Sequence, residues 1–190
     1  KTPKHVALDH HGNPKGAHHD LAQANEFTGH TVHIVNLLAM TDNPLEAMLA
    51  SSVEETVVPA LRKKGFRVVH QRTTPSVSDI NALRDTRSQL WVLSDRSPHL
   101  SGAHVEAIAG LYQAGHGLYI VGDNPPYTQD ANALAEATLN VSLVGQTEGR
   151  TVIKERSGNG PGFIRHPITT GLNTLYEGDT VSHVTPASRM

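Results

Sequence analysis

The stretch from Gln89 to Asn124 constrains the fold more than any other part of this 190-residue chain. It holds two short apolar runs, QLWVLSD and GLYIVGDN, separated by a longer segment whose apolar residues recur at three- and four-residue spacing. Short apolar runs closed by polar residues are typical of strands buried on both faces, and the wider spacing gives a helix one apolar face. The stretch therefore predicts a right-handed βαβ crossover, in which the two strands run parallel.

Segments with these two patterns alternate through the middle of the chain. Strands are expected at 31–39, 66–71, 89–95 and 117–122, and the last helix of the series at 127–139. Such alternation is typical of an α/β fold with a doubly wound, mainly parallel central sheet. We expect Val92, Leu93, Ile120 and Val121 to be among the most buried residues of that sheet.

The region that follows the first expected strand carries two signals for the start of a helix. Asn43 can cap a first turn in which Pro44 takes the first position and Glu46 reaches back to the cap amide. A second capping box at Ser52–Glu55 leaves open whether the region holds one helix or two.

After residue 140 the pattern changes, and a β-rich C-terminal part is expected. VSLVGQT and RTVIKER are predicted to form a hairpin joined at Glu148–Gly149, with a last strand at 180–184. Residues 1–30 form a histidine-rich N-terminal segment and residues 31–190 the α/β domain, so the chain is expected to be a single domain overall. Its first residue is Lys1 rather than methionine, which is expected for a mature form, for a trimmed chain or for a domain of a larger protein.

Composition narrows the classes of partner. Sixteen Lys and Arg against eighteen Asp and Glu give a formal net charge of -2, and no basic run predicts a nucleic-acid partner. No apolar run approaches the length of about 18 residues that predicts a membrane span. The absence of cysteine excludes disulfides, thiolate metal ligands and a cysteine nucleophile, but leaves the compartment open.

Polar residues close two neighbouring strands of the expected sheet and are the candidate ligand-binding residues. They are Asp95, Arg96, Asp123 and Asn124. Ligands of doubly wound sheets bind at the carboxyl ends of the strands, and the helix after Asn124 can direct unpaired N–H groups there. A guanidinium suits a carboxylate or phosphate, so we predict a small polar or anionic ligand. The alternative is that these residues only cap the turns and pair with one another.

The opening segment contains a second candidate site. Its members are His10, His11, His18, His19 and Asp20. Imidazole and carboxylate are ordinary Zn²⁺ ligands, so a divalent metal could be held there. Adjacent histidines on an extended segment point to opposite sides, however, and the alternative is a solvated polar segment without a cofactor.

Two stretches of the chain resemble the class I glutamine amidotransferase-like superfamily. One begins with the helix start Leu100–Gly102 and ends at Gly122–Asn124, and the other, His166–Leu172, is similar to a motif of the ThuA-like branch. The resemblance covers residues 31–185 and implies a flavodoxin-like sandwich.

The residues that catalyse the amidotransferase reaction are missing from the matching positions. The resemblance places a cysteine where this chain has Asp123, and the expected His-x-Glu pair is absent because Ile168 stands two residues after His166. We therefore expect a superfamily member without glutaminase activity.

These observations lead to one functional prediction and one alternative. The prediction is a non-catalytic ligand-sensing or protein-interaction module, with a small ligand or a protein as its partner and no cofactor. The alternative is a metal-dependent hydrolase that uses the histidine and aspartate cluster with a divalent metal such as Zn²⁺. An apolar surface patch would favour the first, and histidines and aspartates converging at the strand ends would favour the second.

Overall fold

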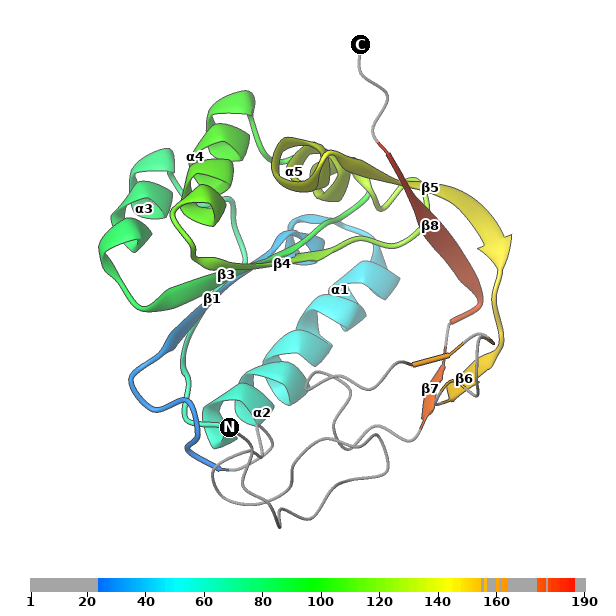
Figure 1. Cartoon of the computed structure of the whole chain (residues 1–190), viewed down its shortest axis with the longest axis horizontal. Helices are drawn as coiled ribbons and strands as arrows, with labels where there is room; N and C mark the ends of the chain where they lie inside the picture. The colour runs from blue at the N-terminus through cyan, green and yellow to red at the C-terminus, as the bar shows by residue number, and fades with distance from the viewer. Residues whose placement is uncertain are drawn as a thin grey trace.

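The computed structural model is organised around a four-stranded, all-parallel sheet (Figure 1). The structure describes residues 24–154, 156, 160, 162–163, 174–176 and 178–186. The strands are β1 (Thr31–Asn36), β2 (Arg67–Gln71), β3 (Ser88–Leu93) and β4 (Gly117–Val121). Their order, β2-β1-β3-β4, is that of a flavodoxin-like doubly wound sheet, so the predicted fold class is confirmed.

Helices cover both faces of this sheet. One face carries α1 (Pro44–Ser52) and α2 (Val58–Lys63), and the other carries α3 (Val77–Ala82), α4 (Gly102–Gln113) and α5 (Gln129–Leu139) (Figure 1). Two short 3-10 turns, η1 (Leu37–Met40) and η3 (Leu83–Asp85), follow β1 and α3. Within the described ranges, no helix is long and apolar enough to cross a membrane.

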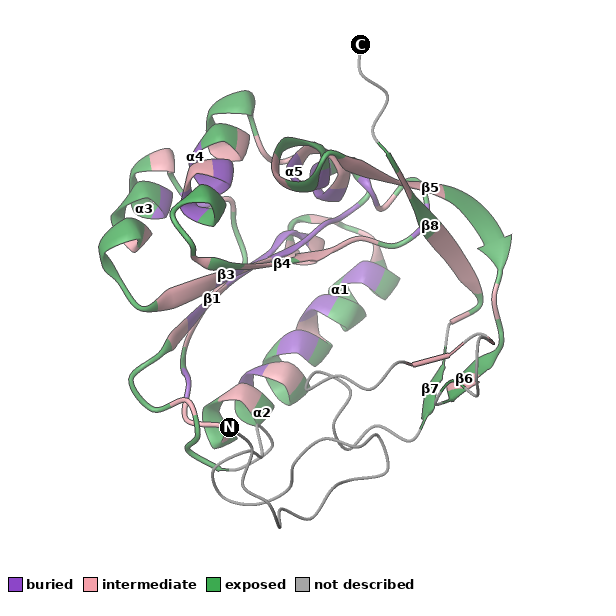
Figure 2. Ribbon diagram, viewed as in Figure 1, coloured by how far each residue is buried: buried purple, intermediate pink, exposed green. Residues whose placement is uncertain are grey.

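Buried residues gather on the central strands and on parts of the helices that cover them (Figure 2). The side chains of β1 and β3 alternate between two apolar cores. Val32 and Ile34 of β1 pack against α2 and the turn just before it, whereas Val35 and the β3 residues Leu90 and Val92 pack against α3, α4 and α5. This two-residue period is the geometry of a pleated strand, and it lets a short apolar run supply both cores.

The region between β1 and β2 forms one continuous helical segment. A π turn, η2 (Val53–Val57), joins α1 directly to α2, and Ser52 makes no capping bond because its hydroxyl donates to the Met48 carbonyl. The second helix start is therefore absent. The π turn lies just before Pro59, which has no N–H to donate to the preceding turn and whose ring crowds it.

The prediction that Ile120 and Val121 rank among the most buried residues is wrong. Val92 and Leu93 of β3 are buried, but both β4 residues are only half-buried. The reason is topological: β4 pairs with β3 alone and is the edge strand of the four-stranded sheet.

The C-terminal part is β-rich, as expected, but its strands pair differently from the prediction. β5 (Val141–Glu148) pairs with β8 (Thr180–Pro186), and β6 (Val152–Lys154) pairs with β7 (Thr174–Tyr176), all antiparallel. Glu148–Gly149 is therefore not a hairpin turn. Instead the Gly149 and Arg150 N–H groups donate to the carbonyls of Asp179 and Gly178, which ties the two strand pairs together.

Candidate ligand-binding site

A cavity of about 380 Å³ lies where the parallel strands end. We call it the strand-end cavity, and its lining residues are Leu38, Leu45, Glu46, Leu49, Ser94, Val121, Gly122, Asp123 and Tyr127. They come from the segments after β1 and β3, from the end of β4 and the segment after it, and from the first turns of α1. In flavodoxin-like folds the ligand crevice lies outside the carboxyl ends of β1 and β3, and small-molecule pockets span roughly 300–1,000 Å³. Both its position and its volume therefore suit a small ligand.

Glu46 is the unusual member of this lining. Its side chain is 1% exposed, and among the described residues neither carboxylate oxygen has a hydrogen-bond partner. The expected capping role is wrong: Asn43 accepts a hydrogen bond from the Leu45 N–H, and the Glu46 side chain points inward instead. Burying a carboxylate without hydrogen bonds is costly, so this position is not explained by helix stability.

Arg96 is the cation that balances Glu46. Its Nε lies 3.0 Å from Glu46 Oε1, so the two form an ion pair, although the N–H does not point at the oxygen. Arg96 Nη2 donates to the Tyr127 hydroxyl at 3.4 Å, and its guanidinium carbon lies 5.8 Å from the centre of the Tyr127 ring. The bond to Tyr127, followed by the negative charges of Glu46 and Asp95, raises the pKa of Arg96, which therefore stays charged.

Asp95 lies beneath the cavity wall rather than in it. Its carboxylate is 1% exposed; Oδ1 accepts from the Ser97 N–H at 2.7 Å, and Oδ2 lies 2.8 Å from His99 Nε2. Because a carboxylate only accepts, the Nε2 of His99 carries the proton in this bond. Asp95 therefore orders the loop that carries Arg96.

The two residues that close β4 have different environments. Asp123 is exposed and lines the cavity, and its Oδ1 accepts from the Asn124 N–H at 2.8 Å. Asn124 is buried, and its Oδ1 accepts from the Thr180 hydroxyl of β8 at 2.8 Å. Of the four predicted residues, the structure thus places Asp123 in the lining and Arg96 against it, with Asp95 and Asn124 bonded within the protein.

The amino end of α5 is less open than the sequence suggests. The Ala131 N–H donates to the Ser94 hydroxyl at 3.3 Å, and Ser94 belongs to the cavity lining. The Asp130 carboxylate points away from the helix and accepts from the His99 and Leu100 N–H groups at 3.0–3.1 Å. These bonds fix α5 to the loop after β3, and they occupy one of the N–H groups that were expected to face a ligand.

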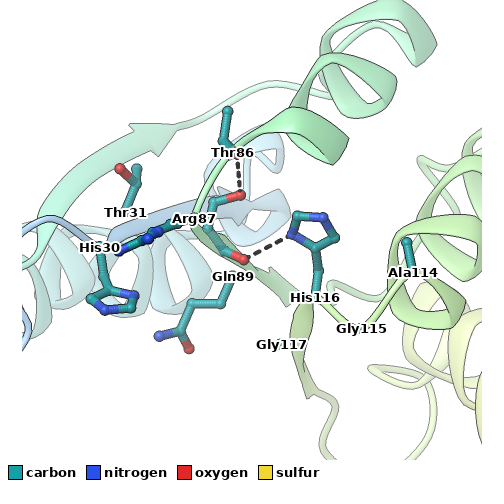
Figure 3. A pocket seen from close by; sticks show the side chains of 10 residues that line it. His30, Thr31, Thr86, Arg87, Gln89, Ala114, Gly115, His116 and Gly117 are labelled. Carbon is teal, nitrogen blue, oxygen red and sulfur yellow. Dashed lines mark hydrogen bonds between the residues drawn. The ribbon is translucent and has the colours of Figure 1, made fainter.

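A second, larger cavity lies at the opposite edge of the sheet (Figure 3). This amino-end cavity measures about 550 Å³, and its lining residues are His30, Thr31, Thr86, Arg87, Ser88, Gln89, Ala114, Gly115, His116 and Gly117. Its polar groups largely bond to the protein: His116 Nδ1 and Nε2 lie 3.1 and 3.2 Å from the Ser88 and Arg84 carbonyls, and the Thr86 and Ser88 hydroxyls bond at 2.7 Å. We therefore take the smaller strand-end cavity as the candidate site.

The predicted metal cluster lies outside the described residues, as does the His166–Leu172 stretch of the superfamily resemblance. In the part of the chain that the structure describes, no group of three or more His, Asp or Glu side chains could hold a metal ion. His99 lies instead against the single carboxylate of Asp95, and the His116 ring against backbone carbonyls.

No family model and no curated protein matches this chain. The observed fold and cavity therefore define its class: an α/β, flavodoxin-like sandwich with a candidate ligand site at the carboxyl ends of its parallel strands. The resemblance to the amidotransferase-like superfamily stays a prediction.

Sequence reasoning missed Glu46, Tyr127 and the leucines of the lining. For Glu46 a signal was present, because it precedes the apolar residues Ala50 and Val53 at four- and seven-residue spacing, on one face of a helix. A carboxylate in line with buried apolar residues indicates a polar group directed inward.

Proposed function

We propose that the chain is a non-catalytic, amidotransferase-like module that binds a small polar ligand in the strand-end cavity. The observation that carries the proposal is the Glu46 carboxylate, which is buried against the cavity and lacks hydrogen bonds within the described residues. A bound ligand with hydrogen-bond donors would satisfy those oxygens and offset the cost of burying them.

The shape and lining of the cavity support ligand binding. Leu38, Leu45, Leu49 and Val121 provide an apolar wall, while Glu46, Ser94 and Asp123 provide a few polar atoms. A mostly apolar pocket with a few convergent polar groups is the usual composition of a small-molecule site. Leu45 and Leu49 are 56% and 45% exposed, so the wall continues to the surface.

The polar groups of the lining also favour binding over catalysis. The Ser94 hydroxyl donates to the Asp95 carbonyl at 3.3 Å and accepts from the Ala131 N–H, so no general base among the described residues activates it. His99 Nε2 is engaged with Asp95. The turn after β4, where the superfamily resemblance would place a cysteine nucleophile, carries the exposed Asp123.

The protein-interaction form of the prediction rests on exposed apolar residues of α1. Leu45 and Leu49 already belong to the cavity lining, and Met48 is exposed beside them. The cavity accounts for two of these side chains, so ligand binding is the form we propose.

A fragment screen by two-dimensional amide NMR tests the proposal. Fragments of all charges would be added to the ¹⁵N-labelled chain, and binders are expected to shift the amides of Ser94, Gly122 and Asp123. Leu49→Trp would fill the cavity and weaken binding by about tenfold or more, roughly 1.4 kcal/mol. Met48→Trp, on the same helix and also exposed but outside the lining, is the matched control and should leave affinity within about twofold, under ~0.5 kcal/mol.

Two results would contradict the proposal. One is a screen in which no fragment shifts the strand-end amides. The other is binding that shifts only Arg87, Gln89 and Gly117, since those residues belong to the amino-end cavity.

A further inference from the structure

We infer that the strand-end cavity selects a small organic amine: an ammonium group that bonds to Glu46, attached to a short apolar body. This inference rests on the proposed function and adds the chemical class of the ligand. It follows from the charge of the lining, the geometry around Glu46 and the apolar walls.

The charges at the cavity favour a cation. The lining contains two carboxylates, Glu46 and Asp123, and one guanidinium, that of Arg96, lies against it. Two negative charges and one positive charge leave a net charge of one negative unit. An anionic ligand would have to approach both carboxylates, and it would compete with Glu46 for the guanidinium of Arg96.

The Glu46 oxygens are buried, and Arg96 does not use their capacity to accept hydrogen bonds. Its Nε is close to Oε1, at 3.0 Å, but forms no hydrogen bond with it, and Oε2 has no hydrogen-bond partner within the described part of the chain. A carboxylate accepts through two oxygens, whereas an alkylammonium group offers three N–H donors. Charge-assisted hydrogen bonds of this kind are about twice as strong as neutral ones.

Arg96 can also give way to a ligand at little cost. Its side chain is 47% exposed, and its bond to the Tyr127 hydroxyl is long, at 3.4 Å. If an ammonium group replaced the guanidinium beside Glu46, Arg96 would turn into solvent and the face of the Tyr127 ring would become available. Aromatic rings attract cations over their faces, so Tyr127 could hold the incoming ammonium as it now holds Arg96.

The rest of the lining sets the size and polarity of the ligand body. Leu38, Leu45, Leu49 and Val121 surround a volume of about 380 Å³, near the lower end of the range for ligand pockets. An amine with one aromatic ring or a short branched chain fits this description.

Three probes of nearly equal shape separate charge from size. Benzylamine, benzyl alcohol and benzoate would each be titrated into the unmodified chain near neutral pH, with the amides of Ser94, Gly122 and Asp123 as the readout. Benzylamine is expected to bind about tenfold or more tightly than benzyl alcohol, the equivalent of one charge-assisted hydrogen bond, and benzoate most weakly.

The Glu46→Gln variant locates the origin of this preference. It keeps the shape of the side chain and removes its charge, so benzylamine should lose about tenfold in affinity while benzyl alcohol changes by less than about threefold. Glu55→Gln is the matched control, because Glu55 lies on the same helical segment, is exposed and is outside the lining; it should leave all three affinities unchanged.

The outcomes distinguish this inference from the proposed function. If benzyl alcohol or benzoate binds the unmodified chain as well as benzylamine does, the amine preference is wrong and ligand binding stands. If other fragments shift the strand-end amides and benzylamine does not, the inference is wrong in the same way. If no fragment of any charge shifts them, both fail. The order of the three probes on the unmodified chain decides the question even if Glu46→Gln does not fold.

Discussion

The two cavities lie at opposite ends of one parallel sheet, and they differ in how their polar groups are satisfied. At the amino ends, His116, Thr86 and Ser88 bond to carbonyls or to each other, in a cavity of about 550 Å³. At the carboxyl ends, the cavity is smaller, about 380 Å³, and it buries the Glu46 carboxylate, which has no hydrogen bond within the described ranges. The Glu46 carboxylate, rather than the cavity volume, therefore indicates which end of the sheet is the candidate binding site.

The largest expected effect comes from replacing Glu46 by an apolar residue. In Glu46→Leu the buried carboxylate disappears and the half-exposed Arg96 turns to solvent. The free energy of unfolding should rise by about 1–3 kcal/mol, because apolar replacements of buried ions are often stabilising. Chemical denaturation gives this value, and Glu55→Leu, at an exposed position, serves as the control. A loss of stability instead would show that the pair with Arg96 is structural, and the contrast between the two ends would disappear.

At the amino ends of the strands, a substitution is expected to lower the free energy of unfolding rather than raise it. His116→Ala removes a ring whose nitrogens lie 3.1 and 3.2 Å from two backbone carbonyls, and should lower the free energy of unfolding by about 1–2 kcal/mol. Arg87→Ala is the control: its side chain lines the same cavity and is exposed, so the change should stay within about 0.5 kcal/mol. Equal losses of stability in the two variants would mean that the His116 contacts do not stabilise the amino ends of the strands.

A change to mildly acidic pH is expected to have a smaller effect on the free energy of unfolding, through His33 and His70. Burial lowers the pKa of His33 and of His70 below 6.5; Arg67 adds to the shift of His33. For His70, Glu54 opposes the shift and Arg72 adds to it. His70 Nε2 lies 3.2 Å from Asn36 Nδ2, and since the amide nitrogen donates, a protonated ring would set two donors against each other.

The sign of the pH effect follows from these lowered pKa values. Below about pH 6.5 the unfolded chain binds more protons than the folded chain, so stability is complete above that pH and falls as the pH drops through the folded pKa. Denaturation curves between about pH 7.5 and 5.5 should show a decreasing free energy of unfolding, and His70→Gln should flatten the decrease. Stability that increased toward acid would contradict the assignment.

The smallest expected effect concerns the N-terminal histidines. If they form a solvated segment, native mass spectrometry should find no stoichiometric Zn²⁺, Mn²⁺ or Ni²⁺ in the purified chain. A tightly held ion that is lost in His18→Ala or His19→Ala would add a third site to the comparison and would favour the hydrolase alternative. Lys15→Ala, in the same segment, is a control for nonspecific loss.

The sequence predicted the parallel sheet well because local patterns encode it. Each central strand is an apolar run closed by polar residues, and the polar ends at Asp95–Arg96 and Asp123–Asn124 are indeed neighbours in space, since β3 pairs with β4. The carboxyl edge of the sheet was therefore foreseeable.

Pairing and burial were harder to predict because they depend on distant segments. β5 pairs with β8 across about 40 residues, and the apolar pattern of neither strand predicts which strand it pairs with. The edge position of β4 has the same origin, because an apolar run looks alike at the centre and at the rim of a sheet. Glu46 was assigned to helix capping because its place in the first turn suits that role, whereas tertiary packing turns it inward.

The π turn at Val53–Val57 determines which residue faces the strand-end cavity. In an uninterrupted α-helix, Ala47 would lie three turns before Val58 and on the same buried face. Glu46 would then lie about 100° around the helix axis from Ala47. The wider turn holds one extra residue and shifts the phase of the amino half, so that Ala47 is exposed and Glu46 is buried. A regular α-helix through the same residues would rotate the carboxylate out of the cavity, whereas deleting one residue of the π turn would place Glu46 three turns before Val58 and keep it facing the cavity.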